Sequence, residues 1–150
     1  MVGWLLDTNV VSELGRTRCN PNVTVWAANQ SEQDLYISVL TLGEYDKGLH
    51  NLPIDSRARR RIEAGIRSIE MQFDGRVLAV SDPIIRRWGR LSGQIQRATG
   101  RAPAVVDTLL AATAIEHGLM LATRNVRDVQ DTGARPFDPW RDDPESLPRA

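Results

Sequence analysis

Two polar clusters in this sequence each follow directly on a short apolar run. Asp7-Thr8-Asn9 comes after the run 2–6, and Thr123-Arg124-Asn125 comes after the run 119–122. If both runs are strands of one parallel sheet, their carboxyl ends lie at the same edge, where ligands of open parallel sheets bind. The two clusters therefore define one candidate site that offers mainly oxygen ligands.

Two further acidic residues are candidates for the same site. Glu44 lies in a helix expected from Ser38 to about His50, just after the second strand, and Asp107 lies in the first turn of a helix expected at 104–116. Each acid also has a simpler explanation. Asp7 is also explained as a helix cap, Asp107 as a complement to the helix dipole, and Glu44 as a surface acid beside the lysine three residues on.

Several carboxylates at one sheet edge repel one another, and a bound cation makes such a cluster tolerable at neutral pH. Oxygen ligands without a thiolate or histidine set favour Mg²⁺ or Mn²⁺, which activate water and stabilise charge on a phosphoryl oxygen. The phosphate-binding patterns GxxxxGK and GxGxxG and the hydrolase pattern GxSxG are absent from the sequence. The residues therefore favour metal-dependent hydrolysis of a phosphodiester.

The elements that must position these residues alternate between apolar runs and helical stretches. The clearest helix is expected at 56–73, where four apolar residues recur at helical spacing, and Ser38 and Ser56 stand at helix starts. Strands separated by helices pair in parallel through right-handed crossovers, so the fold class is a three-layer α/β domain. Its mainly parallel central sheet has four to five strands, expected at 2–6, 35–37, 77–80, 119–122 and 136–137.

Composition narrows the function classes. The chain has 150 residues, which suits one domain, and its single cysteine and two histidines exclude a disulfide framework and a conventional zinc cage. These features fit a reducing, cytoplasmic compartment, and no apolar run approaches the roughly 20 residues that span a bilayer. The net charge of zero argues against binding nucleic acid through overall charge. The segment 57–67, with five arginines and one glutamate, is either a solvated helix face or a phosphate-contacting patch.

Four motifs, in order along the chain, resemble those of PIN-domain proteins, in particular VapC-type toxins of the FitB-like branch. They are Leu5–Glu13 (LLDTNVVSE), Ile37–Glu44, Asp107–Ala114 (DTLLAATA) and Leu121–Asn125 (LATRN). Pro139-Trp140 resembles the end of the terminal Asn-Pro-Trp of this branch, with Asp138 in place of the Asn. The matches span residues 2 to 140. The resemblance implies a PIN-like α/β/α domain at 1–140 and a C-terminal tail at 141–150.

The resemblance also implies an endoribonuclease that cleaves RNA with Mg²⁺ or Mn²⁺. Asp7, Glu44 and Asp107 would be the metal-binding carboxylates, and the fourth catalytic position, often Asp in the family, falls on Asn125. Asn keeps an oxygen ligand but removes a charge; Asp128 is either a substitute one turn on or a cap or surface acid. The expected supporting residues are Thr123 and Asn9, and the expected RNA-contacting residues are Arg57, Arg59 and Arg60.

The partners implied by the resemblance are an RNA substrate, a second copy of the chain in a homodimer, and a small cognate antitoxin, VapB-like or FitA-like, with a DNA-binding domain. No membrane partner is expected. Two alternatives stay open. One is a FitB-like subunit that acts mainly in a DNA-binding antitoxin complex with little nuclease activity. The other is a nuclease acting on DNA or flap structures.

Overall fold

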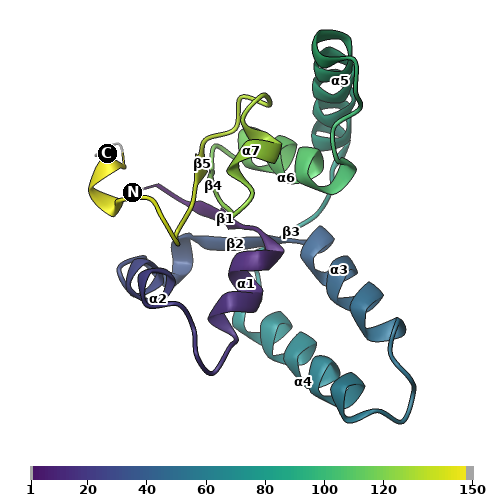
Figure 1. Ribbon diagram of the computed structural model, residues 1–150, viewed down its shortest axis with the longest axis vertical. Helices are drawn as coiled ribbons and strands as arrows, with labels where there is room; N and C mark the ends of the chain where they lie inside the picture. The colour runs from purple at the N-terminus through teal and green to yellow at the C-terminus, as the bar shows by residue number, and fades with distance from the viewer. Residues whose placement is uncertain (1, 148–150) are drawn as a thin grey trace.

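A computed structural model describes residues 2–147 and contains a five-stranded sheet in the order β3-β2-β1-β4-β5, with every pair parallel (Figure 1). The chain passes outward from β1 to β2 and β3, and then returns to place β4 and β5 on the other side of β1. The sheet order therefore reverses at β1, and crevices at such reversals are where open parallel sheets bind ligands. The strands are β1 (Trp4–Leu6), β2 (Leu35–Ser38), β3 (Val77–Leu78), β4 (Met120–Ala122) and β5 (Pro136–Phe137).

Helices cover both faces of the sheet, which confirms the predicted three-layer α/β class (Figure 1). One face carries α1 (Thr8–Leu14), α2 (Pro21–Ala28), α3 (Val39–His50) and α4 (Arg57–Gln72). The other face carries α5 (Asp82–Thr99), α6 (Val105–Glu116) and α7 (Val126–Val129). Short 3-10 helices span Glu32–Asp34 and Pro144–Ser146.

The predicted helix starts at two serines are confirmed. The Ser38 hydroxyl accepts a hydrogen bond from the Leu40 N–H at 3.1 Å, and the Ser56 hydroxyl accepts one from the Arg59 N–H at 3.1 Å. Each bond satisfies one of the N–H groups that the first turn of a helix leaves without a partner. The first cap fixes where α3 leaves the sheet edge, and this fixes the position of Glu44.

Three strands are shorter than the sequence predicts: β1, β3 and, by one residue, β4. The apolar run 77–80 forms a strand only at Val77–Leu78, because β3 pairs with β2 through Ile37 and Ser38 and then β2 turns into α3. Beyond Leu78 no neighbouring backbone remains to pair with this edge strand. In the centre of the sheet, pairing of β1 with β2 and β4 begins at Trp4 rather than at Val2.

The core is divided by the sheet into two clusters. Alternate residues of β1 face opposite layers: Trp4 and Leu6 belong to a cluster with α1 and α2, whereas Leu5 packs with α6. Trp4, Trp26 and Phe137 form the aromatic part of the first cluster, with centroids of the two indoles 5.1 Å apart at 88°. Leu5 and Leu6 are both fully buried, so the strand that ends at Asp7 is held from both sides.

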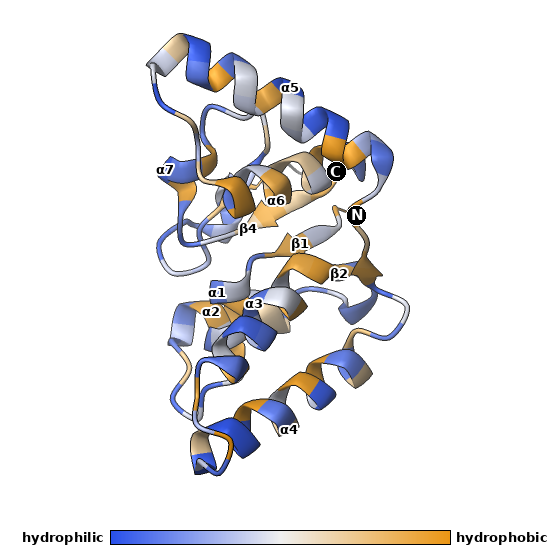
Figure 2. Cartoon of the chain, turned by 90° about the vertical axis from the view of Figure 1, so that its right-hand side faces the viewer, coloured by the Kyte–Doolittle hydropathy of each residue, from blue (hydrophilic) through white to orange (hydrophobic). Residues whose placement is uncertain are grey.

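The two longest helices are amphipathic, as Figure 2 shows by the alternation of apolar and polar residues along α4 and α5. No residue within α4 is fully buried, although the Phe73 that ends it is. The predicted apolar stripe of α4 is therefore real but only half covered by the rest of the chain. In the described part of the chain, no helix combines the length and apolarity that a membrane-spanning segment requires.

Candidate active site

Asp7 lies at the carboxyl end of the central strand, and its backbone N–H donates to the Ala122 carbonyl of β4 at 2.9 Å. Its side chain is 7% exposed and makes no capping bond to α1, although Asp7 stands at the cap position. Instead Oδ2 accepts hydrogen bonds from the Thr123 hydroxyl at 2.7 Å and the Asn9 amide at 3.2 Å. The carboxylate is thus oriented by side chains of both polar clusters, Thr123 after β4 and Asn9 in α1.

Thr123 links the two clusters from a fully buried position. While its hydroxyl donates to Asp7, the same oxygen accepts the Asn125 backbone N–H at 3.0 Å. A third bond runs from the Arg124 N–H to the Asn9 side-chain carbonyl at 3.3 Å. The structure therefore brings together the ends of β1 and β4 through bonds between residues 115 or more positions apart in sequence.

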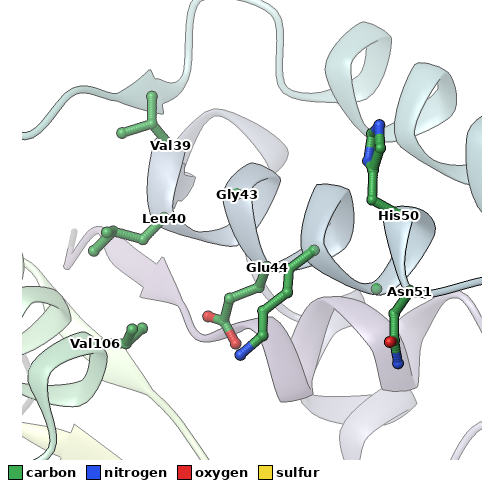
Figure 3. Close-up of a pocket in the computed structure, with 9 residues that line it drawn as sticks. Val39, Leu40, Gly43, Glu44, His50, Asn51 and Val106 are labelled. Carbon is green, nitrogen blue, oxygen red and sulfur yellow. The ribbon is translucent and has the colours of Figure 1, made fainter.

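Glu44 reaches the same edge from α3. Its Oε1 accepts a hydrogen bond from the Thr8 hydroxyl at 2.9 Å, and the Thr8 oxygen lies 3.0 Å from that of Thr41. Figure 3 shows the Glu44 side chain projecting from α3 toward the side where Val106, at the start of α6, lies. An open groove of about 890 Å³ runs from Glu44 along α3 to Asn51 and exposes this acid to solvent.

The raised pKa of Asp107 indicates that the acids lie close together. Burial raises its pKa, and the charges of Asp7, Asp128 and Glu44 raise it further, to about 6. Burial also raises the pKa of Asp7, against the opposing effect of hydrogen bonds from Thr123 and its neighbours. Three acids thus lie close enough to Asp107 to act on its charge, including Asp128, which lies one turn beyond Asn125.

The chemistry of this donor set fits a hard divalent cation. Two carboxylates are held in a desolvated setting that disfavours their charged forms, and within residues 2–147 none of the four acids forms an ion pair with a basic side chain. The side chains are not drawn tightly together, since the described residues include no group of three His, Cys, Asp or Glu side chains placed to hold an ion. Repulsion between the negatively charged carboxylates favours this separation of the side chains.

The arginines expected to contact RNA lie elsewhere. Arg59 and Arg60 donate to the carbonyls of Leu52 and Asp55 at 3.2 and 3.3 Å, which ties them to the connection between α3 and α4. That connection is at the end of α3 remote from the sheet, as Figures 1 and 2 both show. Arg57 is exposed at the start of α4 in the same region. The structure does not bring these three residues to the acidic edge.

The contact of one basic residue beside the site with an aromatic ring is not predicted by the sequence patterns. The Arg124 guanidinium carbon lies 5.2 Å from the ring centroid of Trp140, which belongs to the C-terminal segment. Arg124 belongs to the second polar cluster of the sequence, and Trp140 belongs to its terminal motif. The sequence gives no spacing that pairs them, because their contact depends on the course of the chain after β5.

We expect Asp107→Asn to stabilise the metal-free protein at neutral pH by about 1 kcal/mol, after allowing for solvent screening of this half-exposed group. The folded-state pKa of about 6 exceeds the ordinary value of 3.8, so the folded protein binds the extra proton between these values. Stability of the wild type therefore falls as pH rises through this window. Urea denaturation in EDTA at both ends of the window tests this: an advantage of the variant that does not grow with pH contradicts it.

Comparisons with known proteins extend over nearly the whole chain. The PIN domain family model matches residues 4–133. The chain is 31% identical over 138 residues to Toxin FitB of Neisseria gonorrhoeae, covering 92% of this chain and 99% of FitB. It is 32% identical over 139 residues to VapC ribonuclease Y4jK of Sinorhizobium fredii, covering 91% and 96% respectively. A solved structure of FitAB bound to a DNA fragment superposes with a TM-score of 0.81 at 29% identity, covering 93% of this chain and 97% of that chain.

Proposed function

This chain belongs to the PIN-domain family, and from that premise we propose that it is the toxin of a toxin–antitoxin pair and an endoribonuclease that hydrolyses RNA. The observation that carries the proposal is the convergence of Asp7, Glu44 and Asp107 at the sheet edge. The charges of Asp7 and Glu44 help to raise the pKa of Asp107, and within the described residues none of the three acids pairs with a basic side chain. The name of the S. fredii relative, a VapC ribonuclease, supports the choice of RNA as substrate.

Mg²⁺ or Mn²⁺ would be held by Asp7, Glu44 and Asp107, with Asn125 as the fourth catalytic position. A bound ion of this kind supplies an activated water and stabilises charge on a phosphoryl oxygen. Thr123 fixes the Asp7 carboxylate and Thr8 fixes that of Glu44, so two of the three ligands have their orientation set in advance. Asn9 supports Asp7 from its own cluster. Preset ligands reduce the reorganisation needed when an ion binds.

Two residues, Asn125 and Asp128, are candidates for the fourth position of the proposed site. Asn125 is held through its backbone N–H by Thr123, and its side chain is exposed. Asp128 carries the charge that Asn125 lacks and acts on Asp107 more strongly than Glu44 does. We propose that Asn125 supplies a neutral oxygen and Asp128 the charge, so that a second ion, if one is used, is held less tightly than the first.

The proposed partners follow from the relatives. FitB is a toxin, and FitAB is a complex that was solved on DNA, so we propose a small FitA-like or VapB-like antitoxin with a DNA-binding domain as the partner of this chain. We also propose a homodimer in the cytoplasm, a PIN domain at 1–140 and a C-terminal tail at 141–150. Of this tail, residues 148–150 lie outside the described residues.

A second candidate function is a subunit that acts mainly in the DNA-bound antitoxin complex and has little nuclease activity. The neutral Asn125 at a position expected to be acidic favours it, because one fewer charge weakens cation binding. The similarity to FitAB on DNA fits this function as well. Tight operator binding by the complex, together with no turnover of any RNA with either ion, would establish it over the first proposal.

The test is cleavage of single-stranded RNA by the purified chain with Mg²⁺ or Mn²⁺, with and without EDTA, beside DNA of the same sequence. We expect the chain to cleave the RNA but not the DNA. We also expect EDTA to abolish the cleavage of the RNA. Equal cleavage with and without EDTA would refute the metal site, and preferential cleavage of DNA would favour the rival nuclease. Sequencing of the new 5′ ends then identifies the RNA site.

A further inference from the structure

Trp140 holds a basic side chain beside the acidic edge. Its indole lies under the Arg124 guanidinium at 5.2 Å, and Arg124 directly follows Thr123, which holds Asp7. The Arg124 backbone is itself fixed by its bond to Asn9. Stacking on an aromatic face orients a guanidinium without using any of its five N–H donors. Those donors remain available next to the proposed site of hydrolysis.

The indole is anchored by the C-terminal segment. The backbone N–H of Trp140 donates to Oδ1 of the buried Asp138 at 2.9 Å, and the backbone carbonyl of Trp140 accepts a hydrogen bond from the Asn22 side-chain amide at 2.9 Å. The Asp138 N–H in turn donates to Asp142 at 2.7 Å. The ring is partly buried against the aromatic core cluster. Trp140 is therefore a fixed platform, held from α2 and from its own turn.

Basic groups gather on the same side of the site. Arg124, Arg127 and Arg141 line an open pocket of about 560 Å³ together with Asn125 and Asp128. Two other aspartates line it, but Asp138 and Asp142 accept hydrogen bonds from backbone N–H groups of their own turn. No ion pair of these three arginines exists within residues 2–147.

The nearby Glu13 does not remove the charge of Arg124. Its carboxylate accepts the Asn20 N–H at 2.8 Å and pairs with Arg16 at 3.2 Å. Arg124 is close enough to help lower the pKa of Glu13, after the larger effects of Asn20 and Arg16. Glu13 and Arg124 therefore interact only at a distance, and among the described residues the guanidinium forms no ion pair.

We infer that Arg124, stacked on Trp140, is the principal contact of a phosphate-binding subsite for single-stranded RNA, with Arg127 and Arg141 beside it. The subsite would hold a backbone phosphate next to the one that is hydrolysed. This inference rests on the proposed function, since it places the substrate of that site. An arginine suits the task because its planar donors match two phosphate oxygens at once, and the ring beneath fixes their plane.

The test measures binding and cleavage separately. In EDTA, where the chain does not cleave, fluorescence anisotropy gives the Kd of a labelled single-stranded oligoribonucleotide over a series of salt concentrations. We expect Arg124→Ala to weaken binding about tenfold at low salt and to reduce the slope of log K against log salt by about 0.7, the loss of one phosphate contact on a single strand. In cleavage assays it raises KM and leaves kcat little changed.

Arg135→Ala is the matched control. Arg135 immediately precedes β5 and donates to the Gly118 carbonyl at 3.2 Å, so it lies at the amino ends of the strands, opposite the site. The Arg135→Ala variant loses the same charge as Arg124→Ala, and we expect its Kd and its salt slope to equal those of wild type. Arg124→Lys retains the salt slope but binds less tightly than wild type, because an ammonium lacks the planar donor pair.

Trp140 is tested with a variant that keeps a ring. Trp140→Phe preserves the stack and binds RNA within about twofold of wild type, whereas Trp140→Leu weakens binding several-fold. Because the indole also packs on the core, thermal melts accompany both variants. If Trp140→Leu and Trp140→Phe bind RNA equally well, Trp140 is not part of the subsite.

The subsite and the proposed function fail in different ways. If Arg124→Ala and wild type share the same Kd and salt slope while wild type cleaves RNA, the subsite is wrong and the ribonuclease stands. If wild type binds RNA through Arg124 but never cleaves it, the function is wrong and the subsite stands. If wild type does not bind the oligoribonucleotide at all, the subsite is wrong.

Discussion

Asp7→Asn should reduce RNA cleavage by at least about a thousandfold while leaving the protein folded. The amide keeps the shape of the side chain and an oxygen that can accept the 2.7 Å bond from Thr123, but it removes a full negative charge from the centre of the acidic edge. The electrostatic contribution of a bound ion amounts to several kcal/mol, and about 4 kcal/mol corresponds to a thousandfold change in rate. Single-turnover cleavage of the RNA with Mn²⁺ measures the loss.

The control for this variant is Asp74→Asn, which makes the same chemical change at an exposed turn between α4 and β3. It should cleave RNA at the wild-type rate. Circular dichroism and denaturation midpoints of Asp7→Asn should show a folded protein at least as stable as wild type, because burial disfavours the charge that is removed. An Asp7→Asn protein that retains more than a tenth of the wild-type rate would remove Asp7 from the catalytic set.

Trp4→Ala should lower the free energy of unfolding by about 3–5 kcal/mol. Trp4 is 2% exposed and packs edge-on against Trp26 at 5.1 Å and against Phe137 at 5.4 Å. Its indole N–H also donates to the Gln30 side chain at 2.9 Å, so truncation leaves both a cavity and an unpaired acceptor. A single domain has about 5–15 kcal/mol in total, so this loss is a large share of its stability.

Val25→Ala provides the comparison, since Val25 belongs to α2, the same helix as Trp26, but is 57% exposed. It should change the free energy of unfolding by less than about 0.5 kcal/mol. Urea denaturation followed by tryptophan fluorescence and by circular dichroism measures both variants. A loss below 1.5 kcal/mol for Trp4→Ala would mean that the aromatic cluster is not what holds β1, and with it Asp7, in place.

The helices were the most predictable part of this fold, because their signals are local. Ser38 and Ser56 cap helices at the positions where the sequence predicts that helices start. The helix α4 likewise forms where apolar residues recur at helical spacing. Strand ends were less predictable because pairing depends on a neighbour. The run 77–80 has the composition of a strand throughout, yet it stops at Leu78, where its partner strand β2 ends.

The acidic edge could be anticipated because parallel strands necessarily end together, and Asp7 and Thr123 each follow a strand. The contacts that orient the acids could not. The bond from Thr8 to Glu44 and the stack of Arg124 on Trp140 join side chains whose spacing carries no signal. The arginines of the segment 57–67 show the opposite problem: their charge is conspicuous in sequence, but Arg59 and Arg60 are occupied at the end of α4 remote from the sheet.

The central place of the first strand has a consequence for synthesis on the ribosome. β1 is made before its partner β4, which ends at residue 122, so at least 122 residues must be synthesised before the two strands can pair along their full length. Pairing across such a distance along the chain is slow compared with local helix formation. A nascent polypeptide therefore carries Asp7 without Thr123 until position 123 has been synthesised. The acidic edge, and with it the hydrolysis proposed above, therefore cannot assemble until the distant second polar cluster has been added to the chain.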